Sequence, residues 1–244
     1  MLAIVGGSGL SSLDGLTDVR HVAARTSFGD PSAALTVGRL GARELVFLAR
    51  HGECHSIPPH RINYRANIWA LKQAGVREIV AIATVGGIRR DLGPGVLVVP
   101  NQLLDYTWGR PSTFFEGPGA PVTHIDFTQP YAEAVRARIL GAARACGEAV
   151  VDGGVYATTQ GPRLETAAEI SRLEHDGADL VGMTAMPEAA LAREAGIGYA
   201  ALAVVVNHAA GRGDSRQAIS LAAAEQVLKE AMARVRRIIG QLAA

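Results

Sequence analysis

Short apolar or β-branched runs, each bounded by Gly, Pro or Asp, recur along the chain and predict the strands of a sheet. Several of these runs are apolar at nearly every position, which indicates strands that are buried on both faces. The predicted strands are residues 2–5, 34–37, 44–48, 79–83, 96–99, 154–159 and 199–206.

The segments between these runs predict a hairpin and three helices. The link at residues 38–43 is too short for a crossover helix, so its two strands should pair antiparallel within a mixed sheet. Residues 63–75 end in Gly, residues 130–146 carry an apolar side chain at every fourth position, and residues 220–242 begin at a Ser cap. The last helix is predicted to carry one apolar stripe: Leu221, Leu228, Val235, Ile238 and Leu242.

Strands that alternate with helices predict an α/β fold, and 244 residues without a break in composition predict one domain, residues 1–244. A formal net charge of +1 and an aromatic content of 5% argue against nucleic-acid binding. No apolar run reaches the roughly 18 residues of a membrane span, and no signal peptide opens the chain. Two cysteines, Cys54 and Cys146, form no disulfide framework. We therefore expect a cytoplasmic protein with no nucleic-acid or membrane partner.

A glycine-rich turn at residues 5–9 follows the first predicted strand. Glycines let backbone N–H groups approach an anion closely, and the Ser8 hydroxyl adds one more donor. The turn lacks the Lys and Ser/Thr of a P-loop, and Ser12 stands where a dinucleotide fingerprint needs its third Gly. A dinucleotide-dependent dehydrogenase is therefore excluded, whereas a phosphate cradle and a simple tight bend both stay open.

A second candidate for anion binding is the pair Arg50 and His51, which end another predicted strand. A surface Arg beside a capping His is the alternative. His51 also belongs to a group of possible metal ligands with Cys54, His55 and His60. No second pair of ligands at metal-binding spacing accompanies them, so no metal is predicted. Cys54 lacks an orienting group that would make it a nucleophile.

Two threonines stand at similar positions. Thr84 lies where a strand runs into glycines, and Thr184 follows the apolar pair at residues 180–181. Both hydroxyls can bind an anion, although Thr184 could instead cap the helix that begins near Pro187. The neighbouring Met183 is an ordinary core residue or a ligand contact.

Glu165 and Asn207 are polar residues in apolar surroundings. If they line one pocket, they supply one acceptor and one amide, a set that suits a 6-oxopurine ring. Glu165 could instead be a first-turn helix residue, and Asn207 could simply end a strand.

Five ordered motifs together carry a family resemblance that covers nearly the whole chain. The sequence resembles the trimeric purine nucleoside phosphorylases, and within them the methylthioadenosine phosphorylase branch. The resemblance implies a mixed sheet surrounded by helices, a homotrimer, and reversible phosphorolysis of a nucleoside with inorganic phosphate as co-substrate and no cofactor. The motifs are Gly6-Gly7-Ser8-Gly9, Arg50-His51-Gly52, residues 63–71, Gly161-Pro162-Arg163 and residues 182–188.

The resemblance also implies roles for individual residues. Met183 should pack beneath the sugar, Asn207, His208 and Ala209 should contact the sugar and base, and Arg50, His51 and Asn207 should be catalytic. His124 should reach the sugar of a neighbouring subunit. The implied phosphate site is Ser8, Arg50, His51, Thr84 and Thr184.

Three positions depart from the adenosine-type pattern of that branch. Asn207 and Ala209 replace two aspartates, so no carboxylic acid remains to protonate N7 of the purine. Glu165 replaces the usual Ser and would accept a hydrogen bond from N1–H of a 6-oxopurine, whereas adenine has only a lone pair there. These positions predict a 6-oxopurine base.

Leu221 stands where ordinary 6-oxopurine phosphorylases have a His that binds the 5′-hydroxyl. An apolar side chain there favours a 5′-methylthio sugar, although Leu221 could also be plain helix core. The alternatives are a phosphorylase of inosine and guanosine, a methylthioadenosine phosphorylase, and a non-catalytic purine-binding regulatory module.

Overall fold

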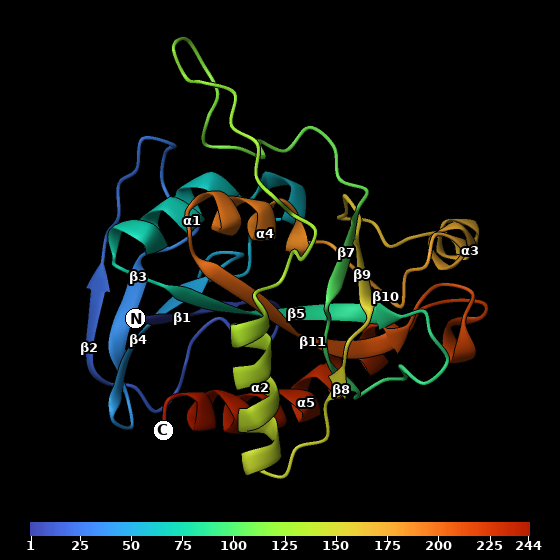
Figure 1. Ribbon diagram of the computed structural model, residues 1–244. Helices are drawn as coiled ribbons and strands as arrows, with labels where there is room; N and C mark the ends of the chain where they lie inside the picture. The colour runs from blue at the N-terminus through green and yellow to red at the C-terminus, as the bar shows by residue number, and fades with distance from the viewer.

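An eleven-stranded mixed sheet forms the centre of the computed structural model, which describes residues 1–244 (Figure 1). All seven predicted strands are present within a few residues, and four further strands join them. The strands are β1 (Leu2–Gly6), β2 (Thr17–Val22), β3 (Leu35–Leu40), β4 (Arg43–Ala49), β5 (Glu78–Gly87), β6 (Leu97–Val99), β7 (Gln102–Asp105), β8 (Val151–Asp152), β9 (Val155–Thr158), β10 (Leu180–Gly182) and β11 (Gly198–His208).

The sheet combines parallel and antiparallel pairs, as predicted. β1 lies parallel to both β4 and β5, and β11 lies parallel to β5 on the other side. β3 and β4 pair antiparallel from Thr36 opposite Phe47 to Leu40 opposite Arg43. The predicted hairpin is therefore confirmed, and its strands continue until only Gly41 and Ala42 remain as the turn.

Five α-helices surround the sheet: α1 (Tyr64–Gln73), α2 (Glu133–Ala145), α3 (Ala167–His175), α4 (Ala185–Glu194) and α5 (Leu221–Leu242). The predicted Ser220 cap is formed, since its hydroxyl accepts a hydrogen bond from the Ala223 N–H at 3.3 Å, and the predicted Gly75 lies just beyond the end of α1 with a positive φ of 80°. Asn63 adds a cap at the start of α1 that the sequence analysis did not predict, by accepting a hydrogen bond from the Ala66 N–H at 3.0 Å. Two short 3₁₀ helices, η1 (Pro59–Arg61) and η2 (Gly213–Ser215), lie in the connections.

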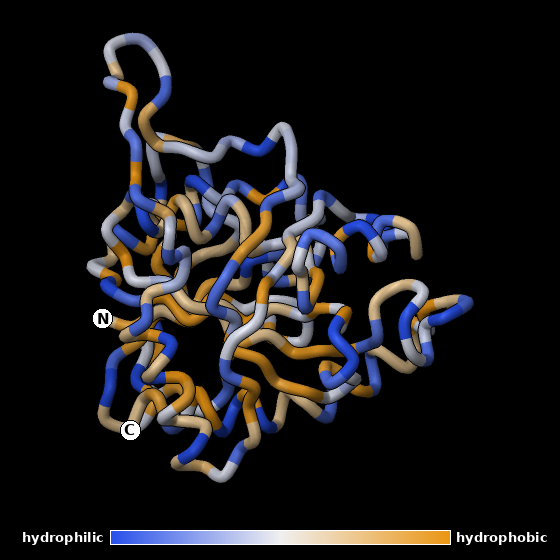
Figure 2. The backbone as a smooth tube through the Cα atoms, turned by 45° about the vertical axis from the view of Figure 1, so that its right-hand side comes forward, coloured by the Kyte–Doolittle hydropathy of each residue, from blue (hydrophilic) through white to orange (hydrophobic).

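The helices form two layers on opposite faces of the sheet (Figure 1). Alternate residues of β1 point to opposite faces. Leu2 and Ile4 pack in a core with α2 and α5, whereas Ala3 and Val5 pack in a second core with α1 and α4. Figure 2 shows the resulting apolar interior beneath a polar exterior. The central strands are thus buried on both faces, as their composition predicts.

Two features of the sequence prediction are wrong or incomplete. The stripe on α5 is buried at Val235, Ile238 and Leu242, but Leu221 is 70% exposed and belongs to no core. The sequence analysis also missed β2, β7, β8, β10 and α3. β2 is exposed at every position, and α3 buries only Ile170 and Leu173, so few buried apolar positions mark either element.

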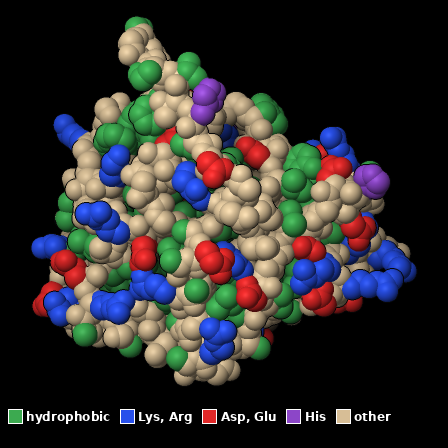
Figure 3. Space-filling view, in the orientation of Figure 1, with side chains coloured by type: hydrophobic (Ala, Val, Ile, Leu, Met, Phe, Trp, Pro, Cys, Tyr) green, Lys and Arg blue, Asp and Glu red, His purple; other side chains and the backbone are tan.

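A long connection between β7 and α2 extends from the top of the molecule in Figure 1. Residues 115–125 of this connection are almost all exposed. Basic and acidic side chains alternate over the face drawn in Figure 3, with no patch of one sign. None of the five α-helices combines the length and the apolar character that a membrane span requires.

Candidate active site

The carboxyl ends of four parallel strands meet at one edge of the sheet and form a cavity there. Ligand sites of α/β sheets commonly lie at such strand ends. Gly7 and Ser8 follow β1, Arg50 and His51 follow β4, and residues 83–86 lie near the end of β5. These three segments are far apart in the sequence but line one cavity. The cavity is also lined by Met183 and Thr184, which follow β10, by Asn207 on β11, by Ala209 after β11, and by Glu165.

An irregularity in β11 determines how this strand contributes to the cavity. Neighbouring residues of a regular strand point to opposite faces. The register with β5 shifts between Val205 and Asn207, which leaves Val206 as an extra residue. Both Val206 and Asn207 then line the cavity. The bulge thus turns the Asn207 amide toward the site, a role that bulges often have beside active sites.

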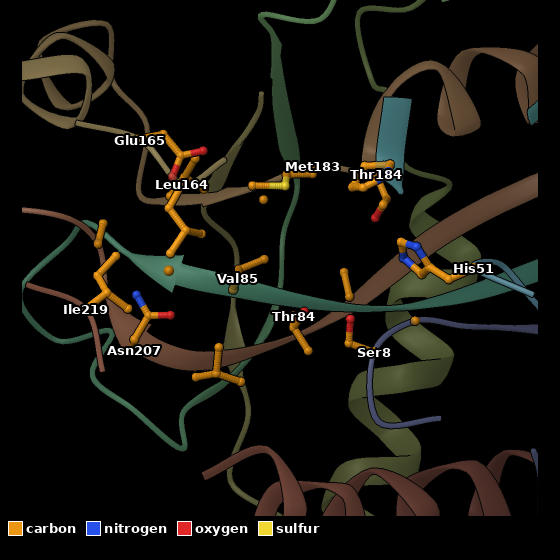
Figure 4. Close-up of a pocket in the computed structure, with 18 of the residues that line it drawn as sticks. Ser8, His51, Thr84, Val85, Leu164, Glu165, Met183, Thr184, Asn207 and Ile219 are labelled. Atoms are coloured by element: carbon orange, nitrogen blue, oxygen red, sulfur yellow. The ribbon is translucent and has the colours of Figure 1, made fainter. Parts of the chain in front are cut away.

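The lining residues divide into two groups at opposite ends of the cavity (Figure 4). Glu165 and Asn207 lie at one end, beside the apolar Leu164 and Ile219. The other end is formed by residues predicted to bind phosphate, namely Ser8, His51 and Thr184, with Thr84 and Met183 between the ends.

Arg50 is buried at the phosphate end and is held by several hydrogen bonds. It is 1% exposed, and its Nε and Nη2 donate to the two carboxylate oxygens of Glu188 at 2.7 and 2.9 Å. Nη1 donates to the Ile82 carbonyl at 2.9 Å, and the Tyr199 hydroxyl donates to Glu188 at 2.9 Å. The pKa of Arg50 lies above its usual value: burial opposes the charge, but Glu188 outweighs burial. A surface Arg is therefore the wrong alternative.

Gly7 allows the first glycine-rich turn to approach this arginine. A Cβ atom at Gly7 would lie 2.5 Å from the Ile82 carbonyl oxygen and 3.0 Å from Arg50 Nη1. Any side chain at this position would push the turn away from the guanidinium. The glycine thus brings the turn that carries Ser8 against Arg50.

His51 is a neutral hydrogen-bond acceptor in this site. Its Nδ1 lies 2.8 Å from the Ile57 carbonyl, which can only accept, so Nδ1 carries the hydrogen. Burial, together with the nearby charge of Arg50, lowers the pKa of His51 to about 4. At neutral pH its Nε2 therefore presents a lone pair, which can accept a hydrogen bond from a hydroxyl group of monohydrogen phosphate or of a sugar.

Two hydroxyl groups complete the phosphate end. Ser8 Oγ lies 2.9 Å from His55 Nε2, and the His55 ring lies against His51 with 4.7 Å between centroids. Thr184 stands at the N-cap of α4, yet its side chain makes no capping hydrogen bond. Its hydroxyl points toward the cavity in Figure 4 and stays available to a ligand.

At the opposite end, Glu165 and Asn207 are held by neighbouring polar groups. The Thr159 hydroxyl donates to Glu165 Oε1 at 2.6 Å. Asn207 Nδ2 donates one hydrogen to the His208 carbonyl at 2.6 Å, which leaves its second N–H and its Oδ1 for a ligand. A carboxylate acceptor and an amide donor are thus both present at one end of the cavity.

A buried arginine that the sequence analysis missed joins the segments behind the cavity. Arg110 is 9% exposed and has no carboxylate within ion-pair distance. Its Nη1 donates to the Met183 and Met186 carbonyls at 2.9 and 2.6 Å, and its Nη2 donates to the Gln160 carbonyl at 2.8 Å. One side chain therefore fixes both the backbone of Met183 and the turn that precedes Glu165.

Three predicted site residues do not line the cavity of the single chain. His208 turns away, and its Nδ1 accepts a hydrogen bond from the Asp214 N–H at 3.4 Å. Leu221 is exposed at the start of α5, and His124 is exposed on the long connection before α2. Ala209 does line the cavity. No group of three or more His, Cys, Asp or Glu side chains converges as metal ligands would.

Sequence signals for the missed residues differ in strength. Glu188 ends a motif already recognised at residues 182–188, but its partner Arg50 lies 138 positions away. Leu164 is next to Glu165, and Ile219 precedes the cap of α5, so their positions beside recognised features could have identified them as lining residues. Arg110 belongs to no motif, since its partners are backbone carbonyls that carry no sequence signal.

Comparison with known proteins agrees with this architecture. A family model described as the phosphorylase superfamily matches residues 1–244. A probable S-methyl-5′-thioinosine phosphorylase of Pseudomonas syringae pv. tomato is 53% identical over 240 residues, 98% of this chain and 97% of the relative. A 6-oxopurine nucleoside phosphorylase of Pyrococcus furiosus is 46% identical over 215 residues, 86% of this chain and 80% of the relative.

Among solved structures, a methylthioadenosine phosphorylase of Schistosoma mansoni in complex with adenine superposes with a TM-score of 0.94 at 33% identity. The match covers 99% of this chain and 90% of that chain. Fold and site therefore define the class of protein as a pentosyltransferase of the nucleoside phosphorylase type. The chain belongs to the phosphorylase superfamily.

The low pKa of His51 predicts a loss of stability in mild acid. The unfolded chain takes up a proton near pH 6.5, whereas folded His51 does so only near pH 4. As the pH is lowered from about 6.5 to about 4, the free energy of unfolding should therefore decrease by about 3 kcal/mol because of His51. Urea unfolding at pH 7.0 and 4.5 should show a smaller decrease for His51→Asn, which keeps a donor to the Ile57 carbonyl. An equal decrease in both proteins would contradict the assignment.

The contacts of Arg110 predict a selective effect on nucleoside binding. Arg110→Met leaves several buried carbonyls without donors, at about 1–3 kcal/mol each, and frees the backbone of Met183. We expect the KM for nucleoside to rise on the order of tenfold, with a smaller change in the KM for phosphate, in steady-state assays. Arg234→Met is the control, because Arg234 donates to the Gly95 and Ala149 carbonyls, whose residues do not line the cavity. Equal effects of the two variants would refute a specific role for Arg110.

Proposed function

We propose that this chain is an S-methyl-5′-thioinosine phosphorylase. The reaction is the reversible phosphorolysis of 5′-methylthioinosine by inorganic phosphate, which gives hypoxanthine and 5-methylthioribose 1-phosphate. The observation that carries the proposal is the presence of Glu165 and Asn207 at one end of a cavity whose other end holds Arg50, Ser8 and Thr184.

The base end favours a 6-oxopurine. The Glu165 carboxylate would accept N1–H of hypoxanthine, and the free N–H of Asn207 would donate to O6 or N7. Adenine offers Glu165 only a lone pair at N1, and an unpaired buried acceptor costs about 1–3 kcal/mol or more. The names of the bacterial and archaeal relatives, which specify thioinosine and 6-oxopurine substrates, support the same choice.

The proposed mechanism requires no covalent intermediate with the protein. The glycosidic bond breaks before the bond to phosphate has formed, so positive charge develops on the sugar and negative charge on the purine. Arg50, Ser8 and Thr184 orient the phosphate, and Asn207 stabilises the leaving purine through its free N–H. Met183 packs beneath the sugar, on a backbone fixed by Arg110.

The preference for a 5′-methylthio group depends on assembly of several subunits. Leu221 and His124 are exposed in the single chain, at the start of α5 and on the long connection before α2. We infer a homotrimer in which these residues lie near the sugar's 5′ end, with His124 donated by the neighbouring subunit. Leu221 offers that end only apolar surface, which favours methylthio over hydroxyl.

A phosphorylase of inosine and guanosine is the second candidate. Its support is the position of Leu221, which is exposed and does not line the cavity of the single chain. The two candidates share every residue at the base and phosphate ends and differ only in the sugar. A purine-binding regulatory module is disfavoured, because a base sensor needs no Arg50 beside Ser8 and Thr184.

Phosphate-dependent base release from methylthioinosine, methylthioadenosine and inosine under matched conditions tests the proposal. We expect methylthioinosine to have the highest kcat/KM, because Glu165 selects the base and Leu221 selects the sugar. Efficient release of adenine would contradict the base assignment, and equal rates with inosine would contradict the role of Leu221. Absence of release from all three substrates would favour the purine-binding module.

Exchange of the two base-end residues should change the preferred base. In Glu165→Ser with Asn207→Asp, the acceptor for N1–H is lost and a carboxyl that can protonate N7 is gained. The ratio of kcat/KM for methylthioadenosine to that for methylthioinosine should rise on the order of tenfold or more. Leu164→Met, which changes only apolar contact at the same end, is the control. Unchanged selectivity in the double variant would refute both roles.

A further inference from the structure

The Glu188 carboxylate lies behind the phosphate end of the cavity and pairs with Arg50, the cation of that end. Arg50 is the only lysine or arginine side chain that lines the cavity. Its guanidinium lies against Glu188, which is itself 1% exposed and lines no part of the cavity. The positive charge of the site is therefore balanced by an equal negative charge within the protein before any anion binds.

Counting donors shows what remains of Arg50 for a ligand. A guanidinium has five N–H groups. Nε and Nη2 each use one on Glu188, and Nη1 uses one on the Ile82 carbonyl. One N–H remains on Nη1 and one on Nη2, and these are the donors that a ligand can use. The carboxylate occupies the side edge, formed by Nε and Nη2, so an anion can engage only the remaining Nη1 and Nη2 donors.

Neighbouring side chains hold the Glu188 carboxylate in place, as they do the Arg50 guanidinium. The Tyr199 hydroxyl donates to Glu188 Oε1 at 2.9 Å, and the Tyr199 ring stacks on Tyr131 at 6.0 Å between centroids. Glu188 lies in the first turn of α4, the helix that begins directly after Thr184. One ion pair thus sets the distance between the end of β4 and the segment that carries Met183 and Thr184.

We propose that Glu188 is a positioning residue for phosphate: it neutralises Arg50 and leaves only one donor on Nη1 and one on Nη2 for the anion. This inference rests on the proposed phosphorolysis. The consequence is a site that binds phosphate through directed donors rather than through net positive charge. Such a site orients the nucleophile without holding the anion tightly in the ground state.

Two variants separate the charge of Glu188 from its geometry. Glu188→Gln removes the charge and leaves buried Arg50 uncompensated, so bound phosphate replaces the missing anion. The rise in Tm caused by inorganic phosphate, measured at constant ionic strength and without nucleoside, should exceed that of the unaltered protein. Because the remaining Nη1 and Nη2 donors of Arg50 are then misaligned, kcat should fall on the order of ten- to a hundredfold, while the KM for nucleoside stays within about threefold.

Glu188→Asp keeps the charge but moves the carboxylate away from the side edge. Here the rise in Tm with phosphate should match that of the unaltered protein, while kcat still falls at least about fivefold. Glu148→Gln is the matched control, because Glu148 pairs with Arg234 at 2.7 Å and does not line the cavity. It should change neither the phosphate-dependent Tm nor kcat.

The proposal is overturned if Glu188→Gln shows the phosphate-dependent Tm and kcat of the unaltered protein. It is equally overturned if the KM values for nucleoside and phosphate rise together without a larger rise in Tm, as a purely structural role would produce. If Glu188→Gln does not fold, an unchanged kcat in Glu188→Asp overturns it. Phosphate binding is measured without nucleoside, so failure of the proposed reaction would be recognised separately by the absence of base release.

Discussion

The buried ion pair between Arg50 and Glu188 is the interaction on which the rest of the site depends. Removing one partner of such a pair leaves a buried charge, which typically costs about 3–5 kcal/mol. The pair joins the end of β4 to the first turn of α4, and it thereby anchors the end of the segment that carries Met183 and Thr184, which directly precedes α4. Phosphate-end residues from two distant parts of the sequence are therefore held together by one contact.

Hydrophobic pattern predicted the longer strands that are buried on both faces, and it missed elements that are exposed, such as β2, or very short, such as the buried β10. The central strands consist of continuous apolar runs, and the short link in residues 38–43 left only an antiparallel pairing. β2 is exposed at all of its positions, and its place at the edge of the sheet depends on pairing with β3 rather than on burial. α5 shows the reverse case, because the stripe that begins at Leu221 continues the helical period but leaves the core.

At the site, sequence reasoning found the residues that belong to motifs and missed those that act through the fold. Glu165 and Asn207 were recognised as polar residues in apolar surroundings, and they do lie at one end of one cavity. The Asn207 side chain faces the cavity because of a bulge at Val206, and no local sequence pattern predicted this bulge. Arg110 binds carbonyl groups, which every residue possesses, so its partners could only be identified in three dimensions.

The distribution of charge around the cavity suits the proposed reaction as a whole. A sugar that develops positive charge would be destabilised by an uncompensated cation beside it, and the interaction is strong where water is excluded. Glu188 cancels the charge of Arg50, and His51 is neutral because its pKa lies near 4. The sugar would therefore lie between phosphate and a purine that is gaining negative charge, with neutral Met183 beneath it. In the proposed reaction, the neutralisation that weakens ground-state attraction for phosphate would also help to keep a net cation away from the positive charge that develops on the sugar.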